Sequence, residues 1–230
     1  MASLVDQAQQ LLSGLVGSDL VEITLLSLAV SGLATLISLL IGLPLGTWLA
    51  LSRFRSRGLV VSVVNTGMAL PPVVVGLLVA FVLWRSGPLG DLDLMYTPSA
   101  MVIAEVVIAT PVILGLTVAA LGQLDPRLRL QIMGLGASRW QTVWWLWREA
   151  RLPLLAALMA GFGSVISEVG AATMVGGNIL HQTRVLTTAI VLQVSRGDFG
   201  AAIALGAVLL ALAFAINGVL TWAQLRGPRH

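Results

Sequence analysis

The sequence predicts an all-α integral membrane protein with five transmembrane helices, and its composition and its pattern of apolar runs support this prediction. Of the 230 residues, 57% are hydrophobic and only 10% are charged, and the mean hydropathy is +0.96. An ordinary soluble domain carries about 25% charged residues, which its surface needs. Apolar runs long enough to cross a bilayer as helices recur along the chain. A secreted or cytosolic enzyme is therefore excluded.

Five runs are predicted to span the membrane. They are residues 23–52, 58–84, 96–122, 152–176 and 199–223. The third run is interrupted only by Glu105 and the fourth only by Glu168. Because an ionised carboxylate in the hydrocarbon costs a few kcal/mol, both glutamates are expected to face protein or water. An odd number of spans places the two termini on opposite sides.

The arginines predict the orientation, since the chain has no lysine. Ten of them lie on one predicted side: Arg53, Arg55, Arg57, Arg127, Arg129, Arg139, Arg148, Arg151, Arg226 and Arg229. Only Arg85, Arg184 and Arg196 lie on the other side. The positive-inside rule therefore predicts an external N-terminus and a cytoplasmic C-terminus. Since the arginines occupy short loops between apolar runs, we interpret them as topology signals and expect no nucleic-acid partner.

Residues 1–20 are expected to form an external or interfacial segment. They carry two aspartates and no basic residue, whereas a cleaved signal peptide begins with basic residues. A surface helix with Leu4, Leu11, Leu12 and Leu15 on one face and a frayed tail are equal alternatives. No metal site is expected, because the chain has no cysteine and its two histidines are predicted to lie on opposite sides of the membrane.

The longest predicted cytoplasmic connection, residues 123–151, contains two short helices. Asp125 and Pro126 predict the start of the first helix, because Asp caps free amides and Pro suits the first helical position. Glycines at positions 134 and 136 end this helix, and the next begins at residues 137–139. Its tryptophans, at 140, 144, 145 and 147, are typical of a membrane interface. The turn itself suits docking into a groove on a partner, which an interfacial anchor does not explain.

These motifs resemble bacterial ABC importer permeases. The turn Gly136-Ala137-Ser138 with the later Leu152-Pro153 resembles the cytoplasmic loop of that family. Residues 68–77 and 86–90 resemble its oxyanion branch. Residues 166–172 and 174–179, with Arg184, 187–190 and 197–199, are similar to tungstate permeases in particular. The resemblance covers about residues 20–225.

The resemblance implies a type I ABC importer permease core over residues 21–225, located in the plasma (inner) membrane. It also implies import of tungstate, with molybdate, sulfate or another small anion as the alternative substrate. The implied partners are a second copy of the chain, two ATPase subunits and an extracytoplasmic substrate-binding protein. ATP and Mg²⁺ belong to the ATPase, and this chain is expected to bind no cofactor. It contains no phosphate-binding loop of the GxxxxGK[ST] type.

In that family the loop forms a coupling helix, here about residues 123–153, that inserts into the ATPase. The residues implied at this contact are Leu135, Gly136, Ala137, Ser138 and Arg139. The sequence departs from the usual motif, because Leu130, Gln131 and Ile132 replace its Glu-Ala-Ala. Gly136 and Pro153 are also separated by about one helical turn more than usual. We therefore transfer the turn from the family, but not the contacts that depend on the missing glutamate.

A second group of residues is a candidate for the translocation pathway or its gate: Glu168, Gly170, Thr173, Met174, Gly176, Gly177, Asn178, Thr187 and Thr188. The glycines permit close backbone approach, and helix-terminal amides can bind an oxyanion without placing a charge in the membrane. Packing of small residues between helices explains the same pattern, and both interpretations stand. Residues 184–194 are too short to span, and are expected to form a helix in the outer leaflet or in a cavity.

Three further features have alternative interpretations. Glu168 either belongs to the pathway or bonds hydroxyls or backbone amides, and the second role is favoured for both glutamates. Pro71 and Pro72 predict a helix kink that either lines the pathway or only shapes the packing. His181 and Arg184 either attract an anion or a binding protein, or occupy a solvated loop. An intramembrane enzyme that uses either glutamate, and a structural membrane anchor, are the rival functions.

Overall fold

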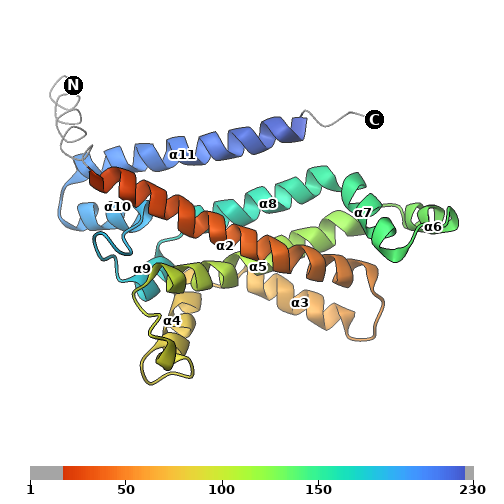
Figure 1. The fold of residues 1–230 in the computed structure, drawn as a ribbon, viewed down its shortest axis with the longest axis horizontal. Coiled ribbons are helices and arrows are strands. Elements are labelled where there is room, and N and C mark those ends of the chain that lie inside the picture. Colours follow the sequence, from red (N-terminus) through yellow and green to blue (C-terminus); the bar gives the residue numbers. More distant parts are fainter. Residues whose placement is uncertain (1–17, 226–230) are drawn as a thin grey trace.

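The computed structural model describes residues 18–225 of this chain, and these residues form helices without a strand among them (Figure 1). The predicted surface helix at Leu4–Leu15 lies outside the described residues. The elements are α2 (Ser18–Leu51), α3 (Arg57–Met68), α4 (Pro72–Leu83), the one-turn 3-10 helix η1 (Gly90–Leu92), α5 (Pro98–Gly122), α6 (Pro126–Gly134), α7 (Arg139–Glu149), α8 (Arg151–Ile166), α9 (Gly170–Gly176), α10 (Leu186–Ser195) and α11 (Phe199–Leu225).

Three of these helices, α2, α5 and α11, are each long and apolar enough to cross a membrane. Two further spans are possible if bent pairs are counted: α3 with α4, bent by 99°, and α7 with α8, bent by 76°. The all-helical prediction is confirmed, and the apolar helices number three to five. The five unbroken spans of the prediction are corrected at two places.

The first correction concerns residues 58–84, predicted as one kinked span. They form two helices, because Pro71 adopts an extended conformation and Pro72 begins α4. A proline lacks the amide that would continue the helix and forces the preceding residue out of the helical region. The second correction concerns residues 152–176, where α8 ends at Ile166 and α9 begins at Gly170.

Helix α5 is the centre of the bundle, in contact with α2, α3, α4, α8 and α9. Figure 1 shows α2 running along the molecule beside α5. Their close approach depends on glycine: a Cβ atom on Gly46 would lie 2.8 Å from the Cβ of Thr117. Small residues at such crossings let helix backbones approach each other in membrane proteins.

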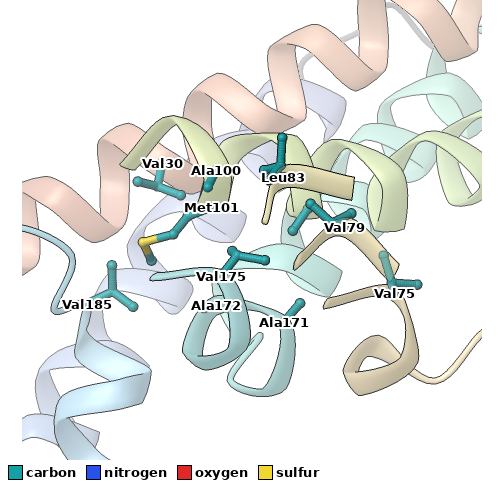
Figure 2. Close-up of a cluster of buried hydrophobic side chains, with 11 residues drawn as sticks. Val30, Val75, Val79, Leu83, Ala100, Met101, Ala171, Ala172, Val175 and Val185 are labelled. Carbon is teal, nitrogen blue, oxygen red and sulfur yellow. The ribbon is translucent and has the colours of Figure 1, made fainter. Parts of the chain in front are cut away.

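A cluster of buried apolar side chains joins α4, α5 and α9 (Figure 2). Val79 and Leu83 come from α4, Met101 from α5, and Val175 from α9, and α2 adds Val30. Met101 and Val175 are fully buried. This packing holds the short helix α9 against the bundle, so the break before it has a fixed position.

The two ends of the molecule carry different elements (Figure 1). Helices α6 and α7 lie at one end, and α9 and α10 lie toward the other. The loop after α2 belongs to the α6–α7 end, since the Arg129 guanidinium donates a hydrogen bond to the Leu51 carbonyl at 3.0 Å. The arginines of residues 53–57 and those of α6 and α7 therefore share one end, as predicted.

Candidate functional site

Glu168 stabilises the break between α8 and α9 through two hydrogen bonds. Its side-chain Oε1 accepts a hydrogen bond from the backbone N–H of Ala171 at 2.9 Å, and so caps the start of α9. Its backbone carbonyl accepts a hydrogen bond from the hydroxyl of Thr187 at 2.8 Å. Glu168 is 8% exposed. The Glu168 side chain thus bonds a backbone amide, as in the second of the two alternative roles given for this residue above.

At the other end of α9 the chain turns through two left-handed residues, Gly177 with φ 72° and Asn178 with φ 54°. A Cβ atom on Gly177 would lie 2.7 Å from the Tyr96 ring, so glycine is required there both by conformation and by space. Arg184 stabilises the turn by donating to Asn178 Oδ1 at 3.1 Å and to its carbonyl oxygen at 3.3 Å. The Asn178 amide donates to the Thr188 carbonyl at 3.2 Å.

Two backbone amides of this turn already have partners in the protein: that of Gly177, which was expected as a donor for an anion, and that of the neighbouring Ile179. The N–H of Gly177 donates to the Thr173 carbonyl at 3.0 Å. The N–H of Ile179 donates to the hydroxyl of Thr183 at 3.0 Å, and that hydroxyl donates to the carbonyl of Gly176. An anion bound here would have to replace these bonds.

The predicted pathway residues differ in their exposure. Four are buried and hold the backbone of the break and of α10: Glu168, Gly176, Thr187 and Thr188. Three are exposed: Thr173, Met174 and Gly177, whereas Gly170 and Asn178 are half-buried. The exposed side of α9 is therefore the part of this segment that can meet a solute.

The break between α3 and α4 adds a second irregular element. Pro71 and Pro72 line a hollow of about 280 Å³ that also includes Val75 of α4 and Ser164 of α8. Within the described chain, α3 has no buried residue. The kink expected from the two prolines is present as a complete break, and it opens beside α8 at the level of Ser164.

Helix α10 begins deep in the bundle. Its first turn is buried, and the backbone N–H of Leu186 donates a hydrogen bond to the Ser27 hydroxyl of α2 at 2.8 Å. Thr188 accepts from the N–H of Val185 at 3.1 Å. The prediction of a short, non-spanning helix in residues 184–194 is confirmed as Leu186–Ser195.

Sequence reasoning missed one contact at this end. His181 Nδ1 lies 2.8 Å from Glu22 Oε2, so the turn after α9 is joined to the first turns of α2. This hydrogen bond raises the pKa of His181 above its ordinary value. The signal available in the sequence was the predicted position of both residues on the same side of the membrane.

Sequence reasoning also missed the close packing of α4 on α9. A Cβ atom on Gly76 would lie 2.6 Å from the Cα of Ala171, and one on Gly170 would lie 2.5 Å from the Val73 side chain. The two glycines therefore bring two helix backbones together. A glycine within an apolar run does not indicate which helix will pack against it, so this contact could not be predicted from the sequence.

At the opposite end, α6 and α7 form a helical hairpin, as predicted. Asp125 accepts from the Arg127 N–H at 2.8 Å and caps α6. Gly136 takes the left-handed conformation with φ 84° in the turn. Ser138 and Gln141 then form a capping box at the start of α7, with each side chain bonding the other's backbone N–H. The turn is therefore rigid although it projects from the bundle.

The surface of this hairpin is apolar and exposed. Leu135 is 89% exposed and Trp140 is 83% exposed. A groove of about 490 Å³ lies between the two helices, lined by Ile132, Leu135, Gly136, Ala137, Gln141 and Trp145. Trp147 is different, because its ring N–H donates to the Thr47 hydroxyl of α2 at 2.8 Å. That bond ties the base of the hairpin to a spanning helix.

Apolar spans with two breaks, and a rigid exposed hairpin at one end, define a multi-pass membrane subunit. This chain belongs to the family described as the binding-protein-dependent transport system inner membrane component, whose model matches residues 42–226. It is thus a transport subunit of the inner membrane. The intramembrane enzyme is accordingly set aside.

Named relatives support the same family. The chain is 40% identical to a probable anion ABC transporter permease of Haloferax volcanii, over 87% of this chain and 88% of that protein. It is 42% identical to the tungstate uptake system permease TupB of Peptoclostridium acidaminophilum, over 86% and 87%. The molybdenum transport system permease ModB of Escherichia coli K12 is 30% identical, over 79% and 83%.

The fold is that of type I ABC importer permeases. A chain of the inward-facing MetNI methionine ABC transporter superposes with a TM-score of 0.68 at 20% identity, covering 90% of this chain and 94% of that chain. An amino acid ABC transporter structure gives a TM-score of 0.66 at 18% identity, covering 90% and 94%. At these identities the likeness concerns the fold alone.

Proposed function

We propose that this chain is the permease subunit of an ABC importer that carries tungstate into the cytoplasm. The observation that carries the proposal is the 42% identity with the tungstate permease of Peptoclostridium acidaminophilum over 86% of this chain. A second tungstate permease, from Campylobacter jejuni, is 33% identical over 71% of this chain. Molybdate and sulfate are the second choice, since their named permeases are 30% and 28% identical.

The hairpin of α6 and α7 is the proposed docking element for an ATPase subunit. Its exposed Leu135 and its capped turn at Ser138 offer a rigid apolar knob, and Arg139 adds a positive charge beside it. ATP and Mg²⁺ are held by that ATPase, and this chain binds no cofactor. The hairpin end faces the cytoplasm, as the arginines gathered there favour.

Two copies of the chain are proposed to enclose the pathway. Support comes from the apolar surfaces of α3 and α4, where Leu59 is 68% exposed and Phe81 is 71% exposed. Such helices must lie against lipid or another protein. The exposed side of α9, with Thr173 and Met174, and the break at Pro71 would then line the route between the copies.

Selectivity is proposed to come mainly from an extracytoplasmic binding protein that delivers the anion. The backbone amides of the candidate Gly177 and of the neighbouring Ile179 are already hydrogen-bonded within this chain, so the pathway offers few free groups for tight binding. Closure of the two ATPase subunits would pull the two hairpins together and open the outward side. Transport then proceeds by rigid-body alternating access.

The substrate is tested by ATP-dependent uptake in cells with and without this gene, in the presence of the binding protein and the ATPase. Elemental analysis measures tungstate, molybdate and sulfate separately and in competition. The proposal is supported if tungstate uptake is lost without the gene and, in cells that carry the gene, persists in the presence of excess molybdate. Equal loss of molybdate uptake widens the substrate to oxyanions, and unchanged uptake of every anion contradicts the substrate assignment.

Docking is tested separately by crosslinking, which is direct because the chain has no cysteine of its own. Single cysteines at positions 134–140 are paired with a cysteine in the ATPase groove, with Ser138→Cys as the reference position. A nucleotide-dependent yield supports docking. Leu92→Cys is the control, since Leu92 is exposed but lies in η1, outside the hairpin. No crosslink at any hairpin position would contradict the assignment.

A further inference from the structure

Glu105 of α5 is a buried carboxyl that the proposed transport cycle does not use. It is 3% exposed, and its Oε2 has no hydrogen-bond partner. Among the buried side-chain polar atoms of the described residues, it is alone in this respect. Since buried polar groups are ordinarily hydrogen-bonded, an orphaned carboxyl oxygen calls for a partner that the protein atoms do not supply.

The other carboxyl of the membrane interior, Glu168, faces the same small cavity. Its lining comes from α2, α5, the α8–α9 break and the start of α10: Ser27, Ser31, Glu105, Val165, Ile166, Glu168, Val185 and Thr187. The volume is about 10 Å³, which is close to the minimum for one water molecule. The cavity is polar as well, which an enclosed water requires.

The charges of this cavity do not balance if both glutamates are ionised. No Arg, Lys or His is found among the described residues that line it. Two like charges that share one buried site cannot both ionise without a large penalty, so one carboxyl takes up a proton.

The hydrogen bonds indicate which glutamate is neutral. Glu168 Oε1 accepts a hydrogen bond from a backbone N–H at the first turn of α9, so this oxygen serves as an acceptor and not as a donor. Glu105 has a hydroxyl partner, Ser31, on one side and none at Oε2. The carboxyl with the unpaired oxygen is therefore the better place for the proton.

A metal cation is a poorer occupant than a proton. A hard cation takes about six oxygen ligands, and most oxygens here are already used. The Ser27 hydroxyl donates to the Ile23 carbonyl and accepts from the Leu186 N–H. The Thr187 hydroxyl donates to the Glu168 carbonyl. Too few oxygens are left to enclose an ion.

We propose that this cavity is a proton-binding site, in which neutral Glu105 donates from Oε2 to one enclosed water that in turn donates to the Glu168 carboxylate. The proton removes one charge from the bilayer interior, and the water links α5 to the α8–α9 break. No bond other than this hydrogen-bond chain forms. The inference is independent of which anion is carried.

The test is infrared spectroscopy of the transporter complex in lipid vesicles at neutral pH. The wild type is expected to show a protonated-carboxyl C=O band that shifts in D₂O and is lost in Glu105→Gln. Glu149→Gln, an exposed control, should keep it, and Glu168→Gln should keep it at a shifted frequency. Absence of the band from the wild type, or its loss in Glu168→Gln but not in Glu105→Gln, overturns the proposal.

Two further measurements cover the remaining outcomes. Labelling glutamate with ¹³C at the side-chain carboxyl moves the band in the wild type, so the result stands even if Glu105→Gln does not fold. Only Glu105 and Glu168 are buried among the four glutamates of the chain. Thermal stability is also compared in sodium and in choline buffers. Equal midpoints are expected, and a rise in sodium that Glu105→Gln abolishes would show a cation site instead.

Discussion

The hydroxyl of Thr187 donates a hydrogen bond to the backbone carbonyl of Glu168 at 2.8 Å, and thereby joins the start of α10 to the break between α8 and α9. A carbonyl in a helix break has lost its helical donor and must find another partner within the protein. The side chain of Glu168 also accepts a hydrogen bond from the Ala171 N–H. The break is therefore held from both sides, and α10 is one of its supports.

Replacing this hydroxyl should destabilise the protein. Thr187→Val keeps the shape of the side chain but leaves the buried Glu168 carbonyl unpaired, which costs about 1–3 kcal/mol. We expect a lower midpoint of thermal unfolding in detergent. Thr173→Val is the matched control, because the exposed Thr173 hydroxyl donates to the Val169 carbonyl, which also accepts from the Thr173 backbone N–H and so keeps a partner. Equal midpoints for the two variants would contradict the role assigned to Thr187.

The packing of α4 on α9 should not tolerate a methyl group. In Gly76→Ala the new Cβ would lie 2.6 Å from the Ala171 Cα, a backbone atom that cannot move alone. Overpacking of this kind costs about 1–3 kcal/mol. Gly206→Ala is the control, because nothing lies within 4 Å of its Cβ position, and alanine is the better helix former there. Thermal unfolding should separate the two, and a neutral Gly76→Ala would contradict the close contact.

The capping box at the start of α7 should matter for coupling. Ser138→Ala removes the side-chain acceptor of the Gln141 N–H, and loss of such a cap costs about 1 kcal/mol of helix stability. Because the turn at Ser138 is exposed, unlike the buried Leu146 further along α7, we expect weaker stimulation of the partner ATPase by substrate-loaded binding protein. Ser138→Thr, which keeps the cap, should retain stimulation. Equal loss of stimulation in both variants would contradict the role assigned to the capping hydroxyl.

The contact between His181 and Glu22 predicts a pH-dependent link at the α10 end. The hydrogen bond to Glu22 raises the pKa of His181 above 6.5. The link is therefore complete below about pH 6.5, and it is lost as the pH rises through the raised value. An NMR titration of the imidazole should show a midpoint above 6.5 that falls in Glu22→Gln. Glu149→Gln, at the hairpin end, should leave it unchanged, and salt should weaken the shift.

Several features could be predicted from contiguous residues. The hairpin of α6 and α7 follows from Asp125, Pro126, Gly136 and Ser138, whose capping and turn preferences act over three or four positions. The long helices follow from the length of the apolar runs. The two breaks were less accessible: Pro71 and Pro72 indicated a kink, but the break at Ser167–Val169 contains no proline. There a glutamate side chain competes for the first amides of α9, which composition does not reveal.

The sequence by itself determined the membrane class, the helical content, the grouping of arginines at one end and the α6–α7 hairpin, because each depends on the length of an apolar run or on local spacing. Only the tertiary structure decided which polar groups meet. In the fold, the buried Thr187 bonds Glu168 and Gly76 packs on Ala171. His181 contacts Glu22, and Glu105 lines the same cavity as Glu168. These contacts join different helices, and in an apolar chain one helical face looks much like another until packing selects its neighbour.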